Sequence, residues 1–157
     1  GRPGIPSPGW QPASAISLLS SRERHDLMIA LLHDTRTRIG RNDPAAALDR
    51  IAETESQVGI DFGPAWMRAR VLALKAEAQT ALGDFAAARA TLDKAWSLAE
   101  GHSPDSEEVR LCAETYVALF RAWHRAEPNE GFEDLARNWA TRAAQFREQA
   151  EALRATP

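Results

Sequence analysis

Few residues in this chain have the types and spacing that catalysis or metal binding needs. His25 and His33 are eight positions apart, about two turns of a helix, so they could share one face and bind a metal. A metal would need further ligands, and the carboxylates nearest in sequence, Asp26 and Asp34, lie about one residue off that face. Neither the spacing nor the ligand set is typical of a metal site, and we expect no bound metal and no cofactor.

The other reactive side chains also favour a chain without catalytic function. Cys112 is the only cysteine, which excludes an intrachain disulfide, and its apolar neighbours predict a small buried hydrophobe rather than a reactive thiol. His124 could face a groove, or it could be a solvated residue near a helix end, where positive charge is favourable. The chain has no phosphate-binding glycine loop, no G-x-S-x-G elbow and no H-E-x-x-H motif.

Composition and charge indicate one globular domain. The 157 residues are 44% hydrophobic and 26% charged, and this length is enough for one sizeable core. The formal net charge of -3 is spread along the chain, so it gives no electrostatic reason to expect nucleic acid or an anionic membrane surface as a partner. A single cysteine fits a reducing compartment, which favours a cytoplasmic location and leaves a periplasmic one open.

Residues 1–19 are predicted to be an extended linker or arm, and residues 20–157 a single helical domain. The first 14 residues contain four Pro and three Gly without periodicity. The sequence begins with Gly1 rather than Met, so we expect an upstream part, such as another domain or a membrane anchor. Membrane attachment is expected only through such an anchor, because no apolar run approaches the ~18–20 residues that span a bilayer.

From Ser20 onward, helix start and stop signals alternate with apolar residues at helical spacing. Ser20 and Glu23 have the spacing of a capping box, Asp43 before Pro44 is a second start signal, and Asp84 is a third. No segment shows strand alternation, so the predicted fold class is all-α. The predicted helices span approximately 20–39, 44–59, 63–82, 85–101, 103–126 and 132–155. Their short connections predict three antiparallel helix pairs.

Internal repetition points to a helical repeat. The second helices of the three pairs begin near Pro44, Phe85 and Phe132, 41 and 47 residues apart, and a period in the forties suits an α-solenoid. The middle unit matches the pattern G-x-[FY]-x-x-A-x-x-x-L-x-x-A at Gly83, Phe85, Ala88, Leu92 and Ala95. This pattern resembles the second half of a tetratricopeptide repeat, and the longer spacing resembles the arrays of kinesin light chains and related bacterial regulators. The resemblance implies a right-handed α-solenoid of six helices.

The outer units match this pattern less well. The first unit keeps Ala47 and Ile51 but is expected to have an expanded turn, and the third carries Leu135 where Ala is expected. Trp96 and Trp139 fall at core positions of the repeat, whereas Trp66 and Trp10 are expected to be partly exposed. The carboxylates Glu53, Glu55, Glu107 and Glu108 are expected to lie on solvated helix faces.

The resemblance also implies a binding site, because in this family the first helix of each pair lines a concave groove for a peptide. In the middle unit the corresponding positions are Arg70, Ala73, Glu77, Thr80 and Ala81. They differ from the Lys/Asn clamp that some family members use, which argues against a chaperone C-terminal carboxylate as ligand. In the first and third units, the residues expected to line the groove are Arg36, Arg38, Phe120, Arg121 and His124. Such a groove would be mixed in charge and modestly basic, suiting an acidic or amphipathic segment. Alternatively, these arginines only lie along the helix surface.

The predicted function is therefore a non-catalytic scaffold that binds a partner peptide or protein segment. One alternative is a regulatory module in cis for an upstream kinase, transcription-factor or membrane-anchored domain. Another is a small-molecule-binding helical domain or an enzyme, which would need a closed cavity with converging polar groups. Self-association is also open, because short repeat arrays can stack end to end.

Overall fold

The computed structural model describes residues 20–58 and 63–157, and the regular elements in these ranges are all α-helices, so the all-α prediction is confirmed. The predicted linker and Trp10 lie outside the described residues. The helices cover most of the described chain, in the order α2 (Ser21–Gly40), α3 (Pro44–Val58), α4 (Ala65–Ala81), α5 (Phe85–Ala99), α6 (Glu107–Ala126) and α7 (Phe132–Ala155).

Side-chain capping explains the starts of α2 and α3. The hydroxyl of Ser20 accepts a hydrogen bond from the backbone N–H of Glu23 at 3.2 Å, and the Asp43 carboxylate accepts one from the N–H of Ala46 at 3.2 Å. Asp84 occupies the N-cap position of α5, but its side chain accepts no capping bond.

The fifth predicted helix begins later than expected. We predicted a start at residues 103–104, whereas α6 begins at Glu107 with Ser106 as its N-cap. The N–H of Ser106 donates to the carbonyl of Ser103 at 2.9 Å, so the residues before the helix form a turn of their own. Pro104 belongs to this turn and does not mark the start of the helix, in contrast to our prediction.

The turn of the first unit is not expanded, in contrast to our prediction. Three residues join α2 to α3 and three join α4 to α5. Asn42 in the first turn and Gly83 in the second adopt left-handed backbone angles, with φ of 59° and 80°. In both turns the amide after this residue donates to the carbonyl five residues earlier, at 2.8 and 2.9 Å. Asn tolerates the left-handed region better than most residues. The repeat pattern has Gly at this position, so the similarity of the two turns could not be recognised from the pattern.

Buried positions repeat with the same 41-residue spacing. In the second helices, Ala47, Ile51 and Thr54 of α3 correspond to Ala88, Leu92 and Ala95 of α5, and all are buried. In the first helices, Met28, Leu32 and Thr35 of α2 correspond in the same way to Ala69, Ala73 and Ala76 of α4. Helix α7 follows another pattern, burying Ala136, Ala143 and Ala150 at intervals of seven residues.

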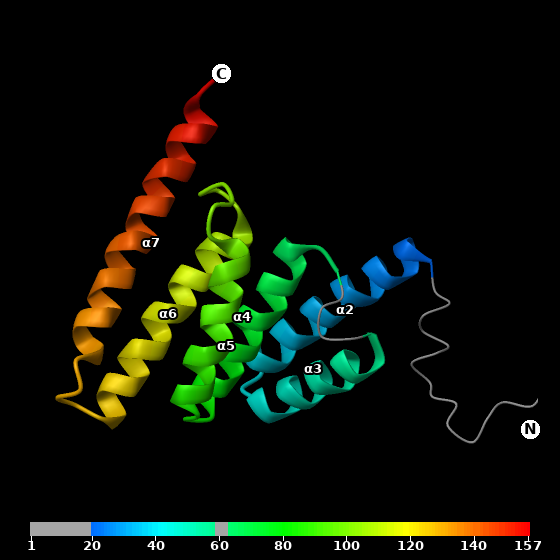
Figure 1. Cartoon of the computed structure of the whole chain (residues 1–157), viewed down its shortest axis with the longest axis horizontal. Helices are drawn as coiled ribbons and strands as arrows, with labels where there is room; N and C mark the ends of the chain where they lie inside the picture. The colour runs from blue at the N-terminus through cyan, green and yellow to red at the C-terminus, as the bar shows by residue number, and fades with distance from the viewer. Residues whose placement is uncertain (1–19, 59–62) are drawn as a thin grey trace, which may run out of the picture.

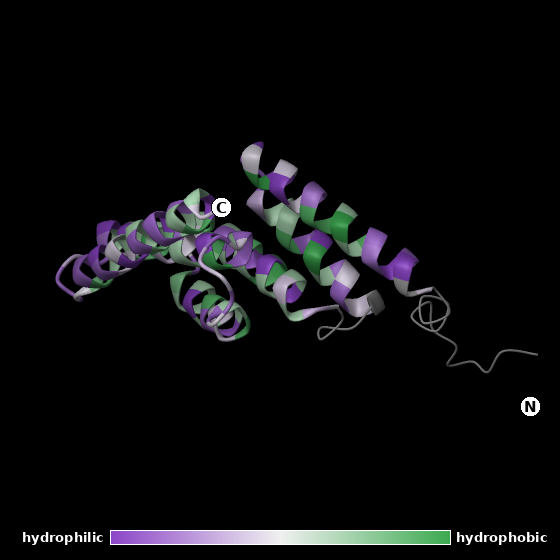
Figure 2. Cartoon of the chain, turned by 90° about the horizontal axis from the view of Figure 1, so that it is seen from above, coloured by the Kyte–Doolittle hydropathy of each residue, from purple (hydrophilic) through white to green (hydrophobic). Residues whose placement is uncertain are grey.

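Helix α4 lies at the centre of the molecule, packed against α2, α3, α5 and α6, while α7 packs against α6 (Figure 1). Two core clusters result, and α4 contributes to both: Ala69, Ala73 and Ala76 to a cluster with α5, α6 and α7, and Met67, Val71 and Leu74 to a cluster with α2 and α3. Along the helices, hydrophobic and hydrophilic segments alternate (Figure 2), as expected when each helix buries only part of its circumference.

Candidate binding groove

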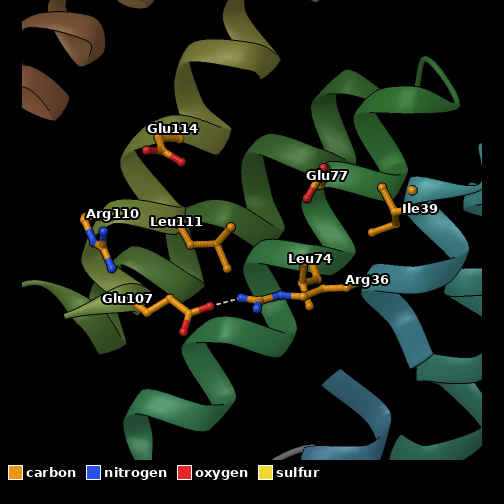
Figure 3. A pocket seen from close by; sticks show the side chains of 9 residues that line it. Arg36, Ile39, Leu74, Glu77, Glu107, Arg110, Leu111 and Glu114 are labelled. Carbon is orange, nitrogen blue, oxygen red and sulfur yellow. Dashed lines mark hydrogen bonds and ion pairs between the residues drawn. The ribbon is translucent and has the colours of Figure 1, made fainter. Parts of the chain in front are cut away.

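A groove runs between α2, α4 and α6. Its first hollow, of about 430 Å³, is lined by residues from all three helices, among them Arg36, Leu74, Glu77, Glu107, Arg110 and Glu114 (Figure 3). Its second hollow, of about 640 Å³, is lined mainly by α4 and α6, including Thr80, Ala81, Thr115, Ala118, Ala122 and Arg125. Glu77 lines both hollows, which joins them into one groove along α4 and α6.

An ion-pair bridge spans one end of the groove. The guanidinium of Arg36 on α2 reaches across α4 and donates a hydrogen bond to the carboxylate of Glu107 on α6 (Figure 3). Arg70 on α4 contacts the other oxygen of Glu107 at 3.4 Å. The hydrogen bond from Arg36 is the largest influence on Glu107, and together with nearby positive charge it lowers the pKa of this carboxyl despite partial burial. The bridge thus connects α2 to α6, which do not otherwise pack together.

The carboxylate of Glu108 lies behind this bridge and is buried. The prediction that Glu108 lies on a solvated helix face was therefore wrong. Its side chain is only 7% exposed, and it contacts Arg70 at 3.4 Å and His102 Nδ1 at 3.0 Å. A buried carboxylate is costly unless it is paired, and both contacts satisfy it. Arg70, which also lies over the Trp66 ring at 4.6 Å, therefore has an internal role, stabilising two carboxylates of α6.

The carboxylates on the groove wall are less completely paired. Burial raises the pKa of Glu77 from its ordinary value of 4.5, and the positive charge of Arg36 opposes this effect. Neither Glu77 nor Glu114 makes a hydrogen bond or ion pair with another described residue. Beside them the groove is lined by short side chains, of which Ala81 and Ala118 are exposed. The groove therefore places two carboxylates without ion pairs next to short apolar side chains.

Two predicted groove residues lie in the core instead. Ala73 is fully buried, and Phe120 is 1% exposed among rings of α6 and α7. Both predictions assumed that one side of each first helix is free. However, α4 packs against four helices and α6 against three, which leaves each of them a narrower free face.

The remaining predicted residues are divided among several surfaces. Arg36, Glu77, Thr80 and Ala81 line the groove, although the Thr80 hydroxyl donates to the Ala76 carbonyl at 2.8 Å. Arg38 lies on the side facing α3, because it contacts Asp34 at 3.0 Å and Asp34 also contacts Arg50 of α3 at 3.3 Å. Arg121 and His124 line a separate hollow between α6 and α7.

The sequence predicted that the helix now labelled α6 lines the groove, but with Phe120, Arg121 and His124 rather than the residues that lie there. Four groove residues of α6, Arg110, Glu114, Ala118 and Ala122, are spaced every four positions. This spacing places them on one helix face, and it was visible in the sequence. With them included, the described groove lining has three arginines and three glutamates, so it is balanced in charge rather than modestly basic.

Other candidate chemistry finds little support in the described part of the chain. Burial, with a smaller contribution from the charge of Glu108, raises the pKa of the Cys112 thiol to about 12, so the predicted buried hydrophobe is confirmed and a thiolate is disfavoured at neutral pH. Residues 20–58 and 63–157 contain no group of three or more His, Cys, Asp or Glu that could hold a metal ion. None of the helices in these ranges is long and apolar enough to cross a membrane.

The predicted roles of the tryptophans agree with their surroundings. Trp96 and Trp139 are partly buried and meet edge to face, with ring centroids 5.2 Å apart, beside the larger core cluster. Trp66 packs against the smaller cluster and is partly exposed.

Comparison with known proteins identifies no relative. No protein-family model matches this chain, and searches of curated proteins and of solved structures find no significant similarity.

Proposed function

We propose that this chain is a non-catalytic protein-interaction domain that binds a partner segment in the groove between α2, α4 and α6. The proposal includes a tetratricopeptide-like architecture, in which α2–α3, α4–α5 and α6–α7 are antiparallel pairs stacked as a right-handed α-solenoid. The 41-residue correspondence of buried positions and the identical hydrogen bonding of the two short turns support this architecture for the first two pairs.

The single observation that carries the proposal is the groove itself. It is open, its first hollow lies between three helices, and it combines two carboxylates without ion pairs, Glu77 and Glu114, with exposed alanines. An enclosed cavity with converging polar groups, which a small-molecule site or enzyme would favour, is a poorer description of this geometry.

The lining also indicates what kind of segment fits. Ala81, Ala118 and Ala122 leave room for apolar side chains, while Glu77 and Glu114 favour a lysine or arginine at the neighbouring position. The arginines at the bridge are already paired with Glu107. Because Arg110 and Arg125 also line the groove, an amphipathic segment that carries charges of both signs is better matched than a purely acidic one.

The test is a selection of binding peptides from a random displayed library with the purified chain. The discriminating variant is Ala118→Arg, which places a long charged side chain in the groove without lowering helix propensity much. Its matched control is Ala90→Arg, the same change at an exposed alanine of α5. We expect selected peptides to bind the Ala118→Arg variant at least about tenfold more weakly and the Ala90→Arg variant as well as the unchanged chain.

Equal helical circular dichroism in all three proteins is the check on folding. Peptides that bind the Ala118→Arg variant as well as the unchanged chain would place the binding surface elsewhere. A library that yields no binder would count against peptide docking as the function.

A further inference from the structure

We propose a second site, which shares Arg125 with the groove, in which the hollow between α6 and α7 binds a doubly charged oxyanion of the phosphate-monoester class. This α6–α7 hollow has a volume of about 310 Å³. Its charged lining consists of Arg121, His124 and Arg125 from α6 with Glu133 and Arg137 from α7, and Ala136 and Ala140 provide space between them.

The hollow has positive charge that the described protein does not balance. Glu133 is the only carboxylate among its lining residues, and it already contacts Arg137 at 3.4 Å and His124 Nε2 at 3.8 Å. Arg121 and Arg125 make no ion pair or hydrogen bond with any described residue. Two guanidinium groups therefore remain available in a chain whose formal net charge is -3.

Their spacing adds a second argument. Arg121 and Arg125 are four residues apart on α6, so they lie on one face, where like charges repel. The partial negative charge at the C-terminus of α6 favours Arg125 and His124, which lie in its last turn, but it does not account for Arg121.

A doubly charged ligand matches this arrangement better than a singly charged one. A phosphate monoester carries about −1.5 to −2 charges at neutral pH and three strong acceptor oxygens, so one group can pair with both arginines. A single carboxylate would occupy one guanidinium bidentately and leave the second without a counter-charge.

The experiment titrates the full chain, labelled with ¹⁵N, with inorganic phosphate at pH 7.5 and constant ionic strength, and records backbone amide shifts by NMR. We expect saturable shifts centred on residues 121–125 and 133–140. Arg121→Gln should weaken this binding about tenfold, as the loss of one charged hydrogen-bonding group does. The matched control is Arg147→Gln, the same change at an exposed arginine of α7 outside the hollow, and it should have no effect.

Three results would overturn the proposal. Shifts that never saturate, or that Arg147→Gln reduces as much as Arg121→Gln, would mean general screening of surface charge. Acetate binding as tightly as phosphate would exclude selection for a dianion. No shift at these residues would leave the arginines without a ligand of this class.

A second arm identifies the source of the phosphate. A capped alanine tripeptide with a central phosphoserine is compared with inorganic phosphate. Tighter binding of the peptide assigns the site to a phosphorylated protein side chain, and tighter binding of inorganic phosphate assigns it to a small phosphate. Arg121 lines only the α6–α7 hollow and Ala118 only the groove, so the Arg121→Gln and Ala118→Arg variants test the two sites separately, and either proposal can fail while the other stands.

Discussion

The α4–α5 interface and the α6–α7 interface join neighbouring helices with side chains of opposite size. Between α4 and α5 the shared cluster is built on fully buried alanines, among them Ala69, Ala73, Ala76, Ala88 and Ala95. Between α6 and α7 it is built on rings: Trp123 and Phe132 stack with centroids 4.1 Å apart, and Tyr116 and Trp139 stack at 4.0 Å. The α4–α5 interface has room only for small side chains, whereas large aromatic side chains fill the α6–α7 interface.

This difference predicts opposite weaknesses. Small side chains let two helices approach closely, so an interface of alanines tolerates little added volume. An aromatic interface holds through large contact areas, so it is sensitive to truncation. The rings also carry α7's link to α5, because Trp96 of α5 meets Trp139 of α7 at 5.2 Å.

The largest expected effect comes from emptying the aromatic interface. Phe120 is 1% exposed and its ring lies near those of Tyr116 and Phe132, at 6.0 and 6.2 Å. Phe120→Ala should lower the free energy of unfolding by about 4 kcal/mol, because it removes buried contacts and leaves a cavity. Urea unfolding followed by circular dichroism measures this change, and Phe120→Leu, which keeps most of the volume, should cost clearly less. A cost below about 1 kcal/mol for Phe120→Ala would contradict the core position of the ring.

Filling the alanine interface should have the next largest effect. Ala76 of α4 is fully buried in the cluster with α5 and α6, so Ala76→Leu should lower the free energy of unfolding by about 2 kcal/mol through overpacking. The control is Ala90→Leu at an exposed position of α5, where the change should stay within about 0.5 kcal/mol. If Ala76→Leu were neutral in the same urea experiment, close approach of α4 and α5 would not be what the alanines provide.

The sequence predicted local features of these interfaces well. Helix bounds follow from caps and turn residues close in sequence, so most were predicted within two residues. The small core positions Ala88 and Ala95 followed from the resemblance to a repeat pattern. The turn at Asn42 was predicted to be expanded because it has Asn where the second turn has Gly83, although both residues adopt left-handed backbone angles.

The site was predicted less completely, because it depends on contacts between helices far apart in sequence. Arg70 was assigned to partner binding, but its contact with Glu108 spans 38 residues and no local pattern indicates it. Phe120 was assigned to the groove because the register of the third unit rested on no repeat match. Glu77, predicted from the middle unit, does line the groove, whereas Arg70 and Ala73 of the same unit are paired or buried by contacts with other helices.

The smallest expected effect concerns Glu77. It tests whether the groove differs from both interfaces in its contribution to the stability of the fold. If the groove serves binding, its residues need not stabilise the fold, and some can cost stability. Burial raises the folded-state pKa of Glu77 above 4.5, so the ionised carboxylate destabilises the fold at neutral pH, while protonation at low pH removes this cost. Glu77→Gln should therefore raise the free energy of unfolding at pH 7 by about 0.3 kcal/mol, a small value because solvent screens this partly exposed group.

The gain from Glu77→Gln should shrink as the pH falls towards and below 4.5, because the wild-type carboxyl is then protonated too. Urea unfolding at pH 7 and pH 4 measures both values, with Glu114→Gln on the exposed groove wall as the control, which should leave stability unchanged. A loss of stability in Glu77→Gln at pH 7 would mean that attraction to Arg36 outweighs the cost of burial. The carboxylate would then stabilise the fold as the two interfaces do, and the groove would lose its distinction from them.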